Sequence, residues 1–214
     1  MNENLIEAQI DVTKKNKLRK IYENNRILIY SIIFIILISF SSLVFYSSLS
    51  KKEDIKIGNS YIEARIFLQK GETEKAKEKL KELIYSDHST YSTLSLFLFL
   101  NENVDSERSE KLSMFDHVLN NNSFDNEIKN LLIYKKALFQ SNFVNEAELL
   151  QITNPLINSD SVWKPHALLL IGDYFLAKKE YVKAREFYTK LLSLKDLDEE
   201  IFKQGKSQFM SINE

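Results

Sequence analysis

The chain of 214 residues has a formal net charge of −1, no cysteine, four glycines and two prolines. The near-neutral charge argues against a nucleic-acid-binding protein, which presents a strongly basic face, and the absence of thiols excludes disulfides, thiol catalysis and zinc–thiolate sites. Because a sheet protein needs turn-forming residues at every reversal, so few glycines and prolines favour an all-α protein.

A long apolar segment follows a short basic tail at the N-terminus. Residues 1–26 hold six basic and four acidic side chains, a net charge of +2, and residues 27–49 hold no charged side chain. A helix over 27–49 would be about 35 Å long, whereas the hydrocarbon core of a bilayer is roughly 30 Å thick. The sequence therefore predicts a transmembrane helix.

The charged flanks of this segment predict its orientation. Short basic segments stay in the cytoplasm, and long domains translocate largely regardless of charge. We therefore expect a single-pass protein with residues 1–26 in the cytoplasm and 50–214 outside it. A cleaved signal peptide is the alternative, since Ser48 and Ser50 imitate a small-x-small cleavage site, but its apolar region would be only about 7–15 residues long.

The part of the chain after the apolar segment begins with two stretches of helical periodicity. Ile55–Lys70 has apolar residues at helical spacing, Gly71 interrupts it, and Glu72–Ser86 places Ala76 and Leu80 on one apolar stripe. Glutamates and lysines stand at i,i+3 spacing on the other face of the second stretch, where they stabilise a helix slightly. These features predict two antiparallel helices joined by a very short turn.

The last pair of predicted helices, Val162–Lys179 and Tyr181–Leu194, repeats this arrangement 108 residues later. That offset is three steps of about 36 residues, close to the 34-residue period of tetratricopeptide repeats. It aligns Ala64 with Gly172, Phe67 with Phe175, Ala76 with Ala184, Leu80 with Tyr188 and Leu83 with Leu191.

The small residues at the aligned positions predict close helix crossings. Where two helices of a hairpin approach closely, one position on each must be small. We expect Ala64 to lie against Ala76 and Gly172 to lie against Ala184. Large neighbours such as Tyr188 would then fill the adjoining space.

Two weaker helix pairs and a capping helix complete the predicted fold. The expected helices are His88–Asn101 and Val104–Asn120, Phe124–Ser141 and Val144–Asn158, and the cap at Leu197–Ile212. Pro155 is expected to end or kink its helix. The prediction is thus an all-α protein, with an N-terminal transmembrane helix followed by a tetratricopeptide-like α-solenoid of about four helical hairpins plus a capping helix.

Two parts of the sequence resemble known families. GDYFLAKKEYVKAREFYTKLL, at 172–192, is similar to a tetratricopeptide motif, but it has Leu191 where that family usually has alanine, and Asp196 stands where proline is usual. The layout of basic tail, apolar span and irregular helix pairs, with WKPHALLLIGDYFLA opening the last pair, resembles the ancillary SecYEG translocon subunit family. This resemblance implies an inner-membrane protein whose periplasmic interaction domain, at 50–214, associates with the translocon and with chaperones for exported proteins.

The sequence contains no recognisable motif for catalysis or metal binding. His88, His117 and His166 lack the paired spacing of metal ligands. The four glycines form no phosphate-binding loop, and lysines accompany most of the carboxylates, which favours solvated helix faces. We expect no catalytic, cofactor-binding or metal site, no cofactor, no nucleic acid and no small-molecule substrate.

Two apolar features each allow a structural and a functional interpretation. Trp163, the only tryptophan, either anchors a partner or packs between the third and fourth helix pairs. The dense cluster of Leu94 and 96–100 either forms a buried core helix or lines a groove for unfolded client proteins.

The leading functional hypothesis is a non-catalytic, membrane-anchored scaffold. In it, the first helices of the pairs form a concave face that binds a peptide or domain, and the span raises the concentration of this domain near a translocon. The alternative is a cell-envelope assembly or division factor that uses the same surface. An enzyme is the third hypothesis, for which the sequence offers no constellation of site residues.

Overall fold

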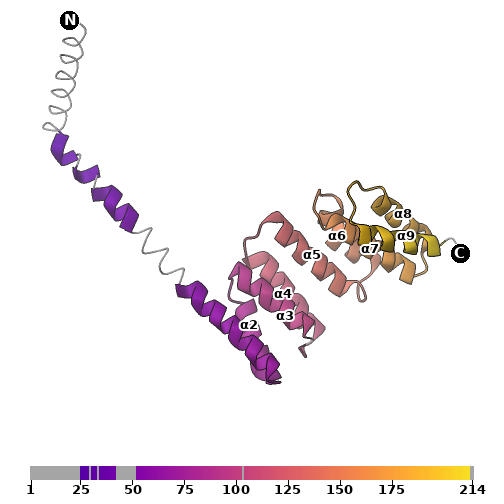
Figure 1. Ribbon diagram of the computed structural model, residues 1–214, viewed down its shortest axis with the longest axis horizontal. Coiled ribbons are helices and arrows are strands. Elements are labelled where there is room, and N and C mark those ends of the chain that lie inside the picture. The colour runs from indigo at the N-terminus through magenta and orange to yellow at the C-terminus, as the bar shows by residue number, and fades with distance from the viewer. Residues whose placement is uncertain (1–24, 29, 33, 42–51, 103, 213–214) are drawn as a thin grey trace, which may run out of the picture. The chain divides into compact units, whose positions relative to one another are not determined.

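The computed structural model describes residues 25–28, 30–32, 34–41, 52–102 and 104–212 (Figure 1). These residues form helices joined by short loops, and no strand occurs among them. The prediction of an all-α protein is therefore confirmed for the described residues. The chain divides into two compact units, Met1–Gly58 and Asn59–Glu214.

The first unit corrects the predicted membrane topology. In the described part of the chain, no helix combines the length and the apolar character that a membrane crossing requires. The predicted single-pass, inner-membrane localisation is therefore wrong. Residues 1–24, 29, 33 and 42–49, on which the predicted tail and span also depended, lie outside the described residues.

The second unit consists of helices that follow one another after short loops. Helical residues extend to 69. They are followed by α2 (Thr73–Ile84), α3 (Ser89–Asn101), α4 (Arg108–Asn121), α5 (Asn126–Gln140), α6 (Glu146–Ile157), α7 (Lys164–Ala177), α8 (Tyr181–Leu192) and α9 (Glu199–Ser211). Pro155 does not end α6, which continues to Ile157.

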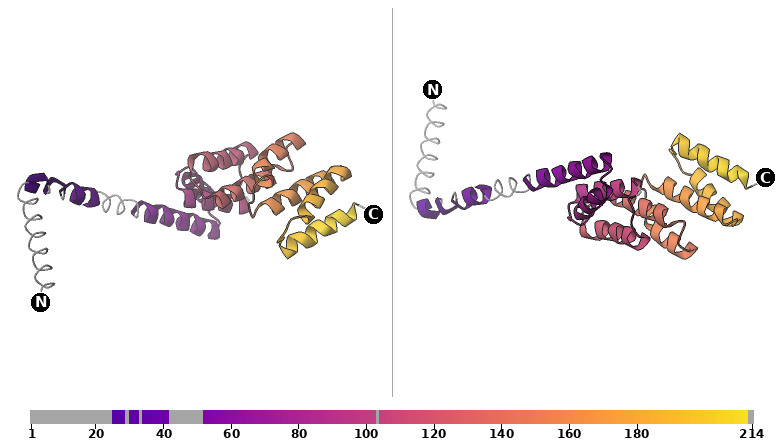
Figure 2. Two further views of the ribbon diagram at one scale, coloured as in Figure 1. Left: turned by 90° about the horizontal axis from the view of Figure 1, so that it is seen from above. Right: turned by 90° about the horizontal axis from the view of Figure 1, so that it is seen from below.

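Each helix packs against the next, and some helices also contact the next but one, as α2 contacts α4. α7 and α8 form the most extensive pair, α5 contacts α7, and α7 contacts α9. Two further views show α9, in yellow, beside the orange and ochre α7–α8 hairpin (Figure 2). α5, α7 and α9 therefore follow one another along one side, an arrangement compatible with a helical solenoid.

The turns of the first and last hairpins have the same backbone geometry at the predicted offset of 108. Gly71 and Lys179 both have left-handed φ angles, +74° and +60°. The N–H of each donates to the carbonyl three residues earlier, Leu68 or Leu176. The next N–H donates to the carbonyl five residues earlier, Phe67 or Phe175. This is the Schellman motif, which satisfies the last carbonyls of a helix and favours glycine at the left-handed position.

Lys179→Gly is expected to stabilise the protein by about 0.5–1 kcal/mol, because glycine adopts a left-handed φ without the Cβ penalty that lysine incurs. The measurement is the midpoint of urea unfolding of the full-length chain. Gly71→Ala at the equivalent turn is the matched control and should destabilise by a similar amount, although a Cβ there would meet no atom within 4 Å. A lower midpoint for Lys179→Gly would contradict the proposed strain.

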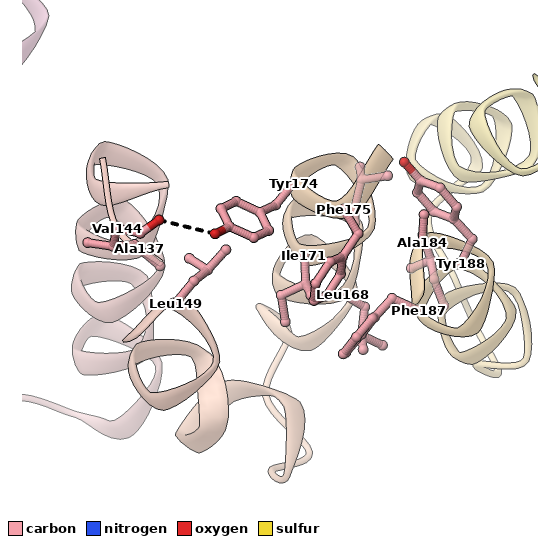
Figure 3. Packing of buried hydrophobic residues seen from close by; sticks show 12 residues of the cluster. Ala137, Val144, Leu149, Leu168, Ile171, Tyr174, Phe175, Ala184, Phe187 and Tyr188 are labelled. Atoms are coloured by element: carbon pink, nitrogen blue, oxygen red, sulfur yellow. Dashed lines mark hydrogen bonds between the residues drawn. The ribbon is translucent and has the colours of Figure 1, made fainter. Parts of the chain in front are cut away.

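Two clusters of buried apolar side chains form the core. The first joins helical residues up to 69 with α2–α5, and its members include Ala64, Leu80, Phe99, Phe115 and Leu132. The second extends from the end of α5 to α8 and includes Leu149, Ile171, Phe175, Ala184 and Tyr188. Figure 3 shows this second cluster, in which Tyr174 donates a hydrogen bond to the carbonyl of Val144.

The aligned repeat positions lie mostly inside these clusters. Ala64, Ala76, Leu80, Ala184 and Tyr188 are fully buried, and Gly172 and Phe175 are also buried. Phe67 is half-buried, and the ammonium group of Lys75 lies over its ring, 5.6 Å from the centroid.

Candidate functional site

Three hollows lie along the first helices of the hairpins. The first, of about 950 Å³, is lined by residues of α5, α7 and α9 and of the α6–α7 and α8–α9 loops. The second, of about 310 Å³, and the third, of about 510 Å³, are lined mainly by α3 and α5. Leu138 lines the first two and Phe97 lines the last two. We call them the acidic, middle and apolar hollows, and together the long groove.

A carboxylate at the start of α5 fixes one wall of the acidic hollow. Glu127 Oε2 accepts hydrogen bonds from Ser161 Oγ at 2.8 Å and from the Val162 N–H at 3.3 Å. The indole N–H of Trp163 donates to the Glu127 carbonyl at 3.1 Å. Three bonds to one residue therefore hold the α6–α7 loop, which places Lys164, Pro165 and His166 along the hollow.

Aromatic side chains from α5 and from the start of α7 pack together behind this loop. The ring of Trp163 stacks on Tyr134, with centroids 5.7 Å apart, and His166 approaches both rings at 5.5 and 5.1 Å. This supports the interpretation of Trp163 as a packing residue between the third and fourth pairs. Tyr134 and His166 also line the acidic hollow, and His166 Nδ1 is buried without a hydrogen-bond partner among the described residues.

Carboxylates give the acidic hollow its charge. Asp160, Asp173, Asp196, Asp198 and Glu200 line it together with only two lysines, a formal balance of −3. Asp198 caps α9, because its Oδ1 accepts hydrogen bonds from the backbone N–H groups of Glu200, at 2.9 Å, and Ile201, at 3.3 Å. None of these five carboxylates forms an ion pair with a described basic side chain.

Asp173 lies half-buried in the middle of α7, where its carboxylate meets the buried Tyr188. The Tyr188 hydroxyl donates to Asp173 Oδ1 at 2.6 Å. Burial raises the pKa of Asp173 above its ordinary value, and the Tyr188 hydrogen bond opposes that rise only partly. Burial, together with the Asp173 charge, also raises the pKa of Tyr134. The Asp173 carboxylate therefore faces the groove without a compensating cation.

The apolar cluster at 94–100 is divided between the core and the apolar hollow. Leu96 and Phe99 are fully buried in the core, whereas Leu94 and Phe97 line the hollow, and Leu94 is 40% exposed. The same helix thus contributes to both the core and the groove. On α5, Ile128 and Leu131 line the opposite side.

The three histidines occupy separate places. His88 caps α3, with its Nδ1 accepting the Tyr91 N–H at 3.4 Å. His117 Nε2 lies 2.7 Å from Asp87 Oδ1, and His166 lies beside the acidic hollow. In the part of the chain that the structure describes, no group of three or more His, Cys, Asp or Glu side chains is placed to hold a metal ion.

Apart from the apolar cluster at 94–100, the residues that form the long groove carry no signal in the sequence. Glu127 and Ser161 are 34 residues apart, so only the tertiary fold reveals their hydrogen bond. Asp173 adjoins the predicted repeat position Gly172, but the sequence does not show that its carboxylate is half-buried. A net negative patch could have been suspected from DSV at 160–162 and DLDEE at 196–200, once these loops were known to meet.

The chain was compared with protein-family models, curated proteins and solved structures, and no significant match was found in any of the three. The resemblance to ancillary translocon subunits therefore stays a prediction.

The raised pKa of Asp173 predicts how stability changes with pH. A carboxyl group with a raised pKa in the folded state favours its protonated form there, so its contribution to stability is present below the ordinary value of about 3.9 and is lost as the pH rises through the folded-state pKa. Asp173→Asn cannot ionise and keeps an acceptor for Tyr188. We therefore expect the variant to gain stability relative to the wild type as the pH rises from about 4 to 7.

Urea unfolding of both proteins at several pH values measures this difference, and effects shared by the other carboxylates cancel in the comparison. A difference that stays constant with pH, or that grows in favour of the wild type, would show that Asp173 ionises without cost in the folded protein.

Proposed function

We propose that the chain is a non-catalytic scaffold that binds another protein in the long groove. The observation that carries this proposal is that the three hollows adjoin along α3, α5, α7 and α9, because Leu138 lines both the acidic and the middle hollow and Phe97 lines both the middle and the apolar one. A series of connected hollows suits an extended polypeptide, because successive side chains can occupy successive hollows.

The repeat architecture supports the proposal. We interpret the hairpins as a tetratricopeptide-like solenoid, since the first and last share the same turn hydrogen bonds at an offset of 108 residues and bury small residues at the aligned positions Ala76 and Ala184. Solenoids of this kind present an extended concave surface for binding. The partially exposed apolar side chains of Leu94 and Leu138 lie on that surface.

The charge distribution supports binding more than catalysis. The carboxylates of the acidic hollow come from two interhelix loops, from mid-α7 and from α9, and neither a thiol nor a described metal-binding group accompanies them. A scaffold needs only shape and charge complementarity at such a surface. The resemblance noted in the sequence would make the partner a component of protein export, and a cell-envelope assembly or division factor would use the same groove.

Site-specific photocrosslinking in cells tests the proposal. A photoreactive amino acid at Leu138, which is 41% exposed and lines two hollows, should capture a distinct protein partner. The matched control is Val182 on α8, which is 85% exposed and lines none of the three hollows of the groove. Adducts at Val182 but not at Leu138 would contradict the proposed surface, and the captured protein identifies the partner.

A further inference from the structure

We infer that the occupant of the long groove is an extended peptide that places lysine or arginine side chains in the acidic hollow and aliphatic or aromatic side chains in the apolar hollow. This inference rests on the proposed function and specifies the chemistry of the partner.

The acidic hollow has a net negative charge. Its five carboxylates outnumber Lys164 and Lys195, the two lysines that line it. Some carboxylates elsewhere on the described surface do pair with lysines, as in Glu146 with Lys183 at 2.5 Å and Glu186 with Lys190 at 2.7 Å, whereas none of the five in the hollow pairs with a described lysine. A surface that gathers carboxylates without partners is complementary to a cation supplied from outside.

Asp173 is a half-buried carboxylate of this hollow. One of its oxygens accepts the Tyr188 hydroxyl at 2.6 Å, and no described cation forms an ion pair with the carboxylate. A half-buried carboxylate gains more from an incoming ammonium or guanidinium group than a fully solvated one does, because water screens it less. The incoming cation would thereby compensate the charge that burial leaves at Asp173.

The acidic hollow also has apolar walls, which suit the aliphatic part of a lysine or arginine side chain. Tyr134, Leu169, Leu170 and Ile201 line the acidic hollow beside its carboxylates. Lysine and arginine carry apolar stems that pack on such surfaces while their charged ends reach polar groups, and an aromatic ring also attracts a cation. The mixture of apolar walls and carboxylates therefore fits these two side chains better than it fits a metal ion.

The α3–α5 end of the groove has a mainly uncharged lining. The apolar hollow takes its name from Leu94, Phe97, Phe124, Ile128 and Leu131, and the rest of its lining is four neutral serines and threonines and one charged residue, Asp125. Apolar side chains of a partner would be buried there. Nucleic acid and anionic lipid are disfavoured as occupants, because their phosphates would meet the carboxylates of the acidic hollow.

The two lysines of the middle hollow predict the direction in which the peptide lies along the groove. The middle hollow shares Leu138 with the acidic hollow and Phe97 with the apolar hollow, and its lining includes Lys111 and Lys135. These lysines disfavour a basic side chain at the centre, so that the basic residues of the peptide are confined to the α7–α9 end. The order of apolar and basic residues in the partner is therefore specified, in addition to its composition.

Fluorescence anisotropy with short labelled peptides and the full-length chain tests the inference. The probe has leucine and phenylalanine in one half and lysines in the other, separated by neutral residues. The comparison peptides replace every lysine with glutamate, or keep the composition and mix the order. We expect the probe to bind roughly tenfold or more tightly than either comparison peptide, and its affinity to fall with added salt.

Protein variants locate the binding site. Asp173→Asn keeps the acceptor for Tyr188, and Glu200→Gln lies at the exposed start of α9, so both are expected to fold. Each should weaken the probe by roughly fivefold or more, and Glu186→Gln on α8 should leave it within about twofold. Equal binding of the lysine and glutamate peptides, or equal effects of all three variants, would overturn the inference.

The outcome at Leu138 separates this inference from the proposed function. A protein captured at Leu138 whose crosslinked segment lacks basic residues would overturn the charge assignment and leave the scaffold intact. Failure of Leu138 to capture any protein would overturn the scaffold itself.

Discussion

Gly172→Leu is expected to lower the free energy of unfolding by about 3 kcal/mol or more, at the upper end of the range for overpacked cores. A Cβ added to Gly172 would lie 2.5 Å from Cε1 of Tyr188, 2.8 Å from Cδ1 and 2.9 Å from Cζ. These distances are shorter than any van der Waals contact. The Tyr188 ring is fully buried, and its hydroxyl is hydrogen-bonded to Asp173, so the ring cannot turn away without losing that bond.

Gly172→Ala tests the same close contact with the smallest added side chain. Alanine in a helix is about 1 kcal/mol more favourable than glycine, yet we expect Gly172→Ala to destabilise because its methyl group meets the Tyr188 ring. The matched control is Gly205→Ala in α9, whose Cβ would lie 2.6 Å from Leu191 Cδ2. That methyl group is the end of a flexible side chain, so the cost should be smaller. Urea midpoints rank the variants, and a Gly172→Ala midpoint at or above the wild-type value would contradict the crossing geometry.

Phe99→Ala is expected to destabilise the protein by about 3–5 kcal/mol, the range for removing a buried phenylalanine. Phe99 is fully buried in the first core cluster, where it packs with residues such as Leu96 and Phe115. The matched control is Phe143→Ala, because Phe143 is 56% exposed. Its ring lies 4.4 Å from the guanidinium of Arg108 and 6.2 Å from the Phe139 ring, and a cation–π contact is worth about 0.5–1 kcal/mol at an exposed site.

Hydrogen exchange distinguishes local from global effects of Phe99→Ala. In the proposed solenoid, where the two core clusters follow one another along the chain, stability is expected to be a sum of local terms. We expect exchange to accelerate more in α2–α4 than in α7 and α8. Uniform acceleration throughout the second unit would show that the two clusters unfold together.

The hairpins at the two ends were predictable because their helices and turns carry local signals. α2 and α8 each bury one stripe, Ala76 and Leu80 in one and Ala184 and Tyr188 in the other. α3 was harder to place, because it mixes buried serines such as Ser92 and Ser95 with its apolar residues. Its core and groove sides therefore could not be separated by periodicity alone.

Other features depended on information that the sequence pattern does not contain. The nearest atoms to a Cβ on Gly172 belong to Tyr188, whereas the sequence analysis paired Gly172 with Ala184. The apolar composition of 27–49 led to the prediction of a membrane span, but no helix among the described residues is long and apolar enough to be one. The long groove depends on contacts between distant segments, such as Glu127 with Ser161.

The central claim is that the long groove is the surface through which the protein acts, and one comparison tests it most directly. Leu138→Glu places a charge in the groove, and Val182→Glu places the same charge on α8; both positions are exposed in the wild type, so both variants should fold. The measurement is the affinity of the partner captured by crosslinking for each full-length variant. We predict that Leu138→Glu weakens binding by roughly tenfold or more and that Val182→Glu stays within about twofold of the wild type. Equal affinities for the two variants would contradict the claim.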